Sequence, residues 1–192
     1  MKTLNQYIQE KLIINKYYHD NMIVVKSFGE LRKIIEDRYD KLGEGTEQNP
    51  IDFNDIDVSN IDSFYNKKTY NGIFDYTFFK YIDISDWDVS NVTDMSCMFF
   101  RCEELESVGD LSKWNVSNVT DMSSMFYRCE LLKSVGDISK WNVSKVTDMT
   151  RMFCWCKSFN QDISDWDVSN VKGRIAVFDG CSIKDEYKPK FK

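Results

Sequence analysis

The stretch WNVSNVTDMSSMF, from Trp114 to Phe126, occurs three times in this chain with few changes. It reads WDVSNVTDMSCMF from Trp87 to Phe99, and WNVSKVTDMTRMF from Trp141 to Phe153. The copies lie 27 residues apart, and a fixed period of about 20 to 50 residues is typical of proteins built from stacked units. The first question for function is whether this stretch binds or reacts with anything, or whether it is scaffolding.

The repeat extends beyond these three copies. Tryptophan recurs at 87, 114, 141 and 166, with spacings of 27, 27 and 25 residues. A degenerate copy, IDVSNIDSF, starts at Ile56 and reaches its own Phe74 only after an insertion around YNKKTYNG. In the last copy Gly173 replaces the aspartate and Arg174 replaces the methionine, which predicts a C-terminal cap.

Apolar residues within one copy fall three apart, with one step of four. The run is Val116, Val119, Met122, Met125, Cys129, Leu132, Val135, Ile138 and Trp141. A half-buried strand would give a period of 2 and an amphipathic helix a period of 3.6, so neither fits. The pattern predicts a solenoid of about five coils of 25–27 residues over 51–183, with like residues stacked at about 4.8 Å.

The first 50 residues differ from the repeats. Leu4, Ile8 and Leu12 predict a short amphipathic helix, and NMIVV (residues 21–25) predicts a strand. A second helix is expected over 27–42, because Ser27 and Glu30 have capping-box spacing and Phe28, Leu31, Ile34, Ile35, Tyr39 and Leu42 share one face. Residues 1–50 are therefore expected to form a helix–strand–helix cap, or else a small docking module, and 184–192 a polar, loosely held tail.

Composition narrows the function classes. A net charge of −6 disfavours nucleic acid and anionic membranes as partners, since both require a basic face. No apolar run is long enough to cross a bilayer, and the N-terminal residues lack a secretory pattern, so a cytoplasmic location is expected. The six cysteines are then expected to be free thiols.

Catalytic and metal-binding roles for the repeats each have a structural alternative. The single histidine, His19, lies outside the repeats, so no serine there has a plausible base. The aspartate columns (Asp94, Asp121 and Asp148; Asp83, Asp110, Asp137 and Asp162) could bind Ca²⁺ or could cap their own turns. Cys102, Cys129, Cys156 and Cys181 are expected to be buried, with Cys97 and Cys154 off that column and exposed. The expectation is a non-enzymatic protein with no cofactor and no metal site.

Residues that vary at fixed positions are the better candidates for recognition. Arg101, Tyr127, Arg128, Arg151 and Trp155 are expected to form a protein-binding face, since arginine and aromatics are favoured at interfaces. The alternative is an ordinary solvated surface, because single exposed aromatics are common.

The unit W-[DN]-V-S-N-V-T-D-M-S-x-M-F-x-x-C resembles the BspA-type leucine-rich-repeat family, in the variant found in mycoplasma-type surface lipoproteins, over about 51–183. The resemblance implies a leucine-rich-repeat-like α/β solenoid without catalytic activity. It also implies adhesion or recognition, with relatives encoded by bacteriophages. We therefore expect a phage-encoded or cytoplasmic module that binds a protein partner. The alternatives are a structural or accessory component of a virion or other assembly, and a calcium-dependent adhesion protein.

Overall fold

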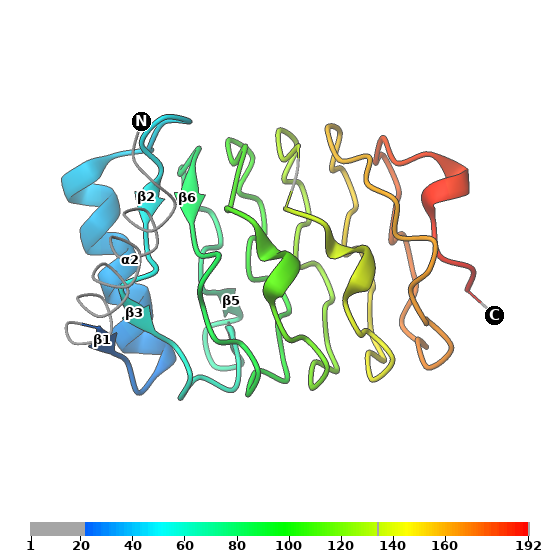
Figure 1. The fold of residues 1–192 in the computed structure, drawn as a ribbon, viewed down its shortest axis with the longest axis horizontal. Helices are drawn as coiled ribbons and strands as arrows, with labels where there is room; N and C mark the ends of the chain where they lie inside the picture. The colour runs from blue at the N-terminus through cyan, green and yellow to red at the C-terminus, as the bar shows by residue number, and fades with distance from the viewer. Residues whose placement is uncertain (1–21, 134, 192) are drawn as a thin grey trace, which may run out of the picture.

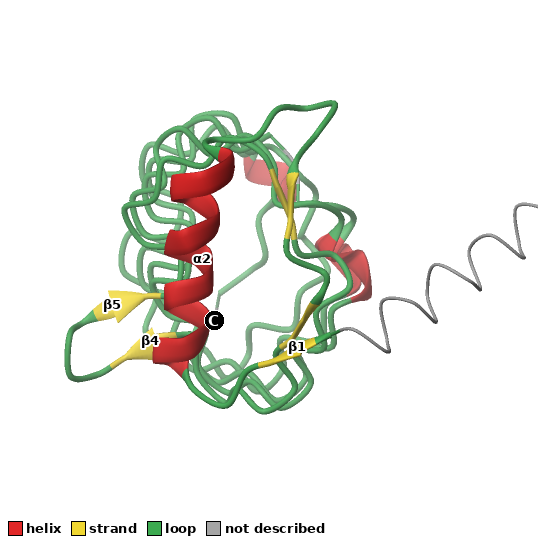
Figure 2. Ribbon diagram, turned by 90° about the vertical axis from the view of Figure 1, so that its left-hand side faces the viewer, coloured by secondary structure: helices red, strands yellow, loops and turns green. Residues whose placement is uncertain are grey.

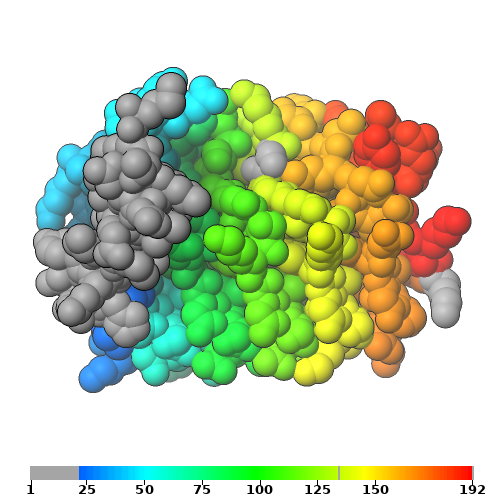
Figure 3. All heavy atoms as spheres, in the orientation of Figure 1, coloured from blue at the N-terminus to red at the C-terminus, as the bar shows by residue number. Residues whose placement is uncertain are grey.

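A computed structural model describes residues 22–133 and 135–191. The chain winds into successive coils that stack along the long axis of the molecule (Figure 1). The coils follow one another in sequence order, so that each forms its own band on the surface (Figure 3). Helix α2 (Phe28–Leu42) lies across the N-terminal end of the stack, where the end-on view shows it in front of the coils (Figure 2).

Regular secondary structure is sparse in this stack. The strands are β1 (Ile23–Val24), β2 (Ile51–Asp52), β3 (Ile56–Asp57), β4 (Tyr65–Asn66), β5 (Asn71–Gly72) and β6 (Ile82–Asp83). The pairs β1–β3 and β2–β6 are parallel, and β4–β5 is an antiparallel hairpin within the YNKKTYNG insertion. The 3-10 helices are η1 (Leu111–Lys113), η2 (Ile138–Lys140) and η3 (Asp185–Tyr187).

Hydrogen bonds between neighbouring coils take the place of long strands. Single parallel bridges join Ser63 to Asp94, Asp94 to Asp121, Asp121 to Asp148 and Asp148 to Gly173. Beyond each bridge, backbone N–H groups of one coil donate to carbonyls of the next, as from Cys97 to Ser123 at 2.9 Å and from Ser124 to Thr150 at 2.8 Å. The copies are thus held in register by repetition of one pattern, which explains why the sequence tolerates so few changes within it.

The shared core contains the apolar columns of the repeat. Phe99 and Phe126 stack with ring centroids 5.3 Å apart, Phe126 and Phe153 at 5.5 Å. Phe74 stacks on Phe99 at 5.3 Å, so the degenerate first copy reaches the same column despite its insertion. Each of these rings is almost completely buried, so a single continuous core runs through the stack.

Polar atoms on buried side chains also join the coils. The indole Nε1 of each repeat tryptophan donates to a carbonyl of the preceding coil: Trp87 to Phe53, Trp114 to Ile84, Trp141 to Leu111 and Trp166 to Ile138. The cysteine thiols also donate to carbonyls of the preceding coil: Cys102 to Phe74, Cys129 to Phe99 and Cys156 to Phe126. A buried donor needs an acceptor, so tryptophan and cysteine recur here because the preceding coil offers one.

Helix α2 starts as its sequence predicts. The Ser27 side chain accepts a hydrogen bond from the Glu30 N–H at 3.2 Å, which confirms the N-cap. Of the apolar residues predicted to share one face, Leu31 and Ile35 are buried, Phe28, Ile34 and Tyr39 pack against the core, and Leu42 is 61% exposed. Leu42 is the last residue of the helix, followed by the C-cap Gly43. The helix expected around Leu4 to Leu12 lies outside the described residues.

One side chain of α2 fastens it to the first coil. Arg32 Nη1 donates to the carbonyls of Gly72 and Ile73 at 3.1 and 3.0 Å, and to Asp75 Oδ1 at 2.6 Å. The Asp75 side chain is only 3% exposed. Burial raises the pKa of Asp75, and the guanidinium of Arg32 opposes that shift.

The C-terminal residues differ from the expected loosely held tail. The N–H of Ile163 donates to the carbonyl of Tyr187 at 3.0 Å, and both Tyr187 and Phe191 pack against the core. Pro189 is buried. The apolar residues among the lysines of this segment cover part of the last coil, which would otherwise be open to water.

Candidate binding face

Two bends in each coil carry residues in the left-handed conformation. The first bend has Cys97, Ser124, Arg151 and Ala176, with φ between 54° and 57°. The second bend has Tyr76, Arg101, Arg128, Trp155 and Gly180, with φ between 55° and 67°. A positive φ is uncommon for residues other than glycine, so the inter-coil hydrogen bonds must hold these bends in place.

The structure brings the five predicted residues together on this side of the stack. The N–H of Arg101 donates to the carbonyl of Tyr127 at 2.7 Å, and the N–H of Arg128 donates to the carbonyl of Cys154 at 2.9 Å. Arg151 occupies the first bend of the coil whose second bend is Trp155. We call these residues, together with the neighbouring aromatics described next, the bend face.

Aromatic side chains form a file across the bend face. Phe100 and Tyr127 stack at 4.9 Å, and Tyr76 meets Phe100 edge-on at 5.6 Å. Trp155 is 43% exposed, with the ammonium of Lys157 5.6 Å from its ring. The file therefore has rings on four successive coils: Tyr76, Phe100 and Tyr127 are in contact, and Trp155 stands on the fourth coil in the bend position that Arg128 holds in the third.

The arginines of the bend face are less available than the sequence suggested. Arg101 Nε lies 3.3 Å from Glu103, and Arg128 lies 3.9 Å from both Glu103 and Glu130. These are exposed pairs, which typically contribute about 0–1 kcal/mol and leave the charges screened. The aromatic residues therefore carry the distinctive chemistry of this surface.

Sequence reasoning missed the most exposed aromatics. Tyr76 is 55% exposed, Phe78 is 61% exposed, and Tyr70 in the β4–β5 hairpin is 77% exposed. All three come from the degenerate first copy, where the insertion hides the repeat register. The structure restores it, since the N–H of Tyr76 donates to the carbonyl of Phe100 as that of Arg101 does to Tyr127. The sequence signal for Tyr76 is its position two residues after Phe74, which matches the position of Arg101 two residues after Phe99.

The cysteines provide no activated thiol. Desolvation raises the pKa of Cys97 to about 11 and that of Cys102 to about 12. Cys154 is 5% exposed, so its expected exposure was wrong, and Cys97 is only partly exposed. All six cysteines are free.

The aspartate columns hold their own turns. Oδ1 of Asp94, Asp121 and Asp148 accepts from the N–H two residues later, at 3.0, 2.8 and 2.7 Å. Asp83, Asp110, Asp137 and Asp162 do the same in the second column. The turn interpretation is confirmed, and one oxygen of each carboxylate is already engaged.

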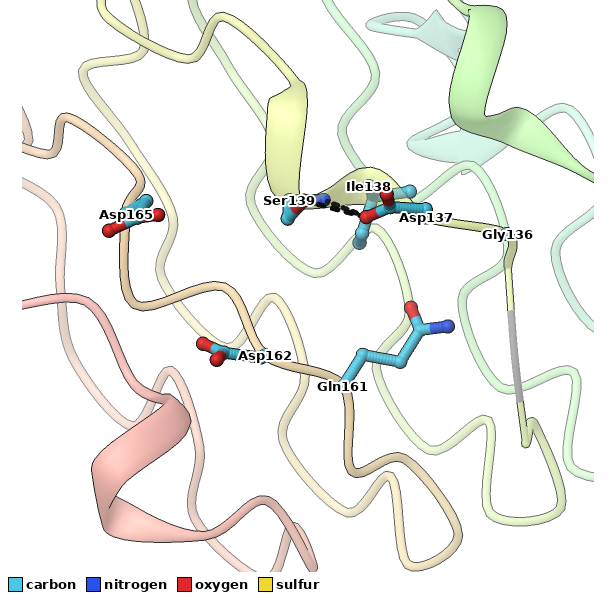
Figure 4. A pocket seen from close by; sticks show the side chains of 7 residues that line it. All are labelled: Gly136, Asp137, Ile138, Ser139, Gln161, Asp162 and Asp165. Carbon is cyan, nitrogen blue, oxygen red and sulfur yellow. Dashed lines mark hydrogen bonds between the residues drawn. The ribbon is translucent and has the colours of Figure 1, made fainter.

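A shallow hollow of about 490 Å³ lies on the opposite side, between η2 and the following coil (Figure 4). Asp137, Asp162 and Asp165 line it, and the dashed line marks the bond from the Ser139 N–H to Asp137. A hydrogen bond from Ser164 lowers the pKa of Asp162. Within 22–133 and 135–191, no group of three or more histidine, cysteine or acidic side chains is arranged to hold a metal ion.

Comparison with known proteins gives a family but no activity. None of the helices in the described residues is both long and apolar enough to cross a membrane. No curated protein and no solved structure matches the chain. Residues 59–189, more than half of the chain, match the family described as "Mycoplasma protein of unknown function, DUF285". The chain belongs to this family of repeat proteins with no assigned function.

Proposed function

We propose that this protein is a non-enzymatic binding module that recognises a protein partner through the bend face. The observation that carries the proposal is the file of partly exposed aromatics, Tyr76, Phe100, Tyr127 and Trp155, on four successive coils. Aromatic side chains provide large contact area at low entropic cost, which is why they dominate binding hot spots. The side chains at positions that hardly vary between repeats, in contrast, are engaged in contacts between neighbouring coils.

The same features support a wider classification. Stacked coils with a parallel ladder and a helix across one end are consistent with a leucine-rich-repeat-like α/β solenoid related to the BspA-type family. Six free thiols, three of them donating to buried carbonyls, suit a reducing compartment, so a cytoplasmic site of action is part of the proposal.

The test is affinity capture from cells that naturally contain the protein, comparing the native chain with Tyr127→Ala/Trp155→Ala. The double variant should fold normally and lose its captured partner, because it removes two rings from the centre and end of the file. Lys113→Ala/Lys140→Ala is the matched control, since both lysines are exposed at the ends of η1 and η2.

Capture can also distinguish the kind of partner. Recovery of structural proteins of a particle, lost in the double variant, would assign the module to an assembly such as a virion. Two results would disprove the bend face as the binding surface. One is that Tyr127→Ala/Trp155→Ala still captures the partner; the other is that only the lysine control loses it.

A further inference from the structure

From the first bend to the second, the backbone hydrogen bonds between coils run in one direction through the stack. In each coil, N–H groups at and between the two bends donate to carbonyls of the next coil, at distances of 2.7–3.0 Å. The donors and acceptors are Phe74 to Met98, Tyr76 to Phe100, Cys97 to Ser123, Phe99 to Met125, Arg101 to Tyr127, Ser124 to Thr150, Phe126 to Met152, Arg128 to Cys154, Arg151 to Ile175, Phe153 to Val177 and Trp155 to Asp179. The two ends of the stack must therefore have opposite polarity.

The N-terminal end exposes acceptors, and the protein satisfies them. The carbonyls of Ile73 and Asp75 are the first in this ladder, and both accept from Arg32 Nη1, at 3.0 and 3.4 Å. A cationic side chain from α2 thus occupies the acceptor end, as expected for a row of aligned carbonyl dipoles.

The C-terminal end exposes donors. Ala176, Phe178 and Gly180 are the counterparts of Arg151, Phe153 and Trp155, and their N–H groups donate to no backbone carbonyl within 22–133 and 135–191. The carbonyls of Ile175, Val177 and Asp179 already accept from the preceding coil. We call residues 173–180 the donor edge, after the N–H groups of Ala176, Phe178 and Gly180; the N–H of Gly173 at its start donates back to the carbonyl of Thr147 at 3.0 Å.

The chemistry of the donor edge restricts its partner. A second copy cannot pair through the same edge, because N–H groups would then face N–H groups. Residues 172–191 contain five lysines and arginines and three acidic residues, a net +2 in a chain of net −6. Within this segment Lys184 and Lys188 pair with Glu186 and Asp185, and Asp179 is the acidic residue on the edge itself. Ile175, 71% exposed, adds an apolar contact beside the donors.

We propose that the donor edge binds an extended acidic segment of a partner protein. Carbonyl or carboxylate oxygens of that segment accept from the N–H groups of Ala176, Phe178 and Gly180, so that the segment continues the ladder as one more strand. The edge adjoins the bend face at Trp155, whose ring lies against Gly180, yet its recognition depends on backbone donors and charge rather than on the aromatic file.

The test uses the whole protein and a fluorescent oligoglutamate peptide, with oligolysine as the comparison peptide. Binding is followed by anisotropy at low salt, and by amide NMR shifts of the protein. Oligoglutamate should bind and shift the amides of Ala176, Phe178 and Gly180. Ile175→Asp should weaken binding about tenfold by placing a like charge on the edge, while the matched Leu131→Asp, on another surface, should not.

Several results would overturn the proposal. They are absence of oligoglutamate binding, equal binding of oligolysine, amide shifts confined to residues outside 173–180, and equal affinity of the two aspartate variants. The amide shifts are measured on the native chain, so they remain decisive even if a variant folds poorly. Tyr127→Ala should bind oligoglutamate normally, which separates this edge from the function proposed for the bend face.

Discussion

At the scale of single residues, the repeated stretch is explained by hydrogen bonds that each copy makes to its neighbour. The sequence alone offered turn capping as one of two roles for the aspartates, and it predicted a buried cysteine column, which is confirmed for Cys102, Cys129 and Cys156 but wrong for Cys181, which is partly exposed. It could not predict that the Trp141 indole donates to Leu111, because an acceptor in the preceding coil is visible only once the coils are stacked.

Trp141→Phe tests this role of the tryptophan. The change removes the Nε1 donor and part of a ring that is 4% exposed, so the free energy of unfolding should fall by about 1–2 kcal/mol. Trp155→Phe, at an exposed position, should change it by less than about 0.5 kcal/mol. Urea unfolding of both variants measures the difference, and equal effects would show that the indole column is not structural.

The aspartate ladder predicts a pH effect of definite sign. Burial, with the neighbouring charges of Asp94 and Asp148, raises the pKa of Asp121 despite its bonds from Ser123. A raised pKa in the folded state means that Asp121 favours folding at low pH, and that this contribution is lost as pH rises through that pKa. Asp121→Asn keeps an acceptor for the Ser123 N–H, so it should be more stable than the native chain at pH 7, by up to about 1 kcal/mol, and lose this advantage in acid.

Asp137→Asn is the control at an aspartate whose pKa is shifted in the opposite direction to that of Asp121. Hydrogen bonds from Ser139 lower the pKa of Asp137, so its contribution is present at neutral pH and lost as pH falls through the folded-state pKa. Its replacement should make stability less sensitive to acid. Unfolding curves at a series of pH values measure both variants. The same sign of change in both would contradict the assigned environments.

At the scale of elements, sequence reasoning worked where the signal was local. The Ser27 cap and helix α2 follow from spacing within one turn. The β4–β5 hairpin and the exposed Tyr70, Tyr76 and Phe78 did not follow: the sequence identified Phe74 as the phenylalanine of this copy, which its stacking on Phe99 confirms, but the residues of the insertion have no counterpart in the other copies.

The attachment of α2 to the stack depends on Arg32. Arg32→Ala leaves the buried Asp75 carboxylate and two carbonyls without their cationic partner, so the free energy of unfolding should fall by about 3–5 kcal/mol. Arg32→Ala/Asp75→Ala should recover part of that loss, because no unpaired charge remains buried. A double-mutant cycle by urea unfolding checks this, and purely additive losses would argue against the pair.

At the scale of the whole molecule, the coils are equivalent units, so that removing one whole coil leaves its two neighbours able to stack on each other. Deleting residues 114–140 joins Lys113 to Trp141 and keeps every column in register, so the shortened chain should fold cooperatively with lower stability and a smaller denaturant m-value. Deleting 114–126 removes only the repeated stretch and should abolish cooperative folding. Circular dichroism during urea unfolding distinguishes the two outcomes, and a folded half-coil deletion would refute the stacking argument.

The central claim is that the repeated stretch builds the scaffold while recognition belongs to the residues that vary between coils. The most direct measurement compares partner capture per folded molecule for Trp141→Phe and for Tyr127→Ala/Trp155→Ala, at a temperature where both variants are folded. The account predicts retained capture with a lowered melting temperature for Trp141→Phe, and lost capture with an unchanged melting temperature for the double variant. Lost capture in Trp141→Phe together with normal capture in the double variant would contradict it.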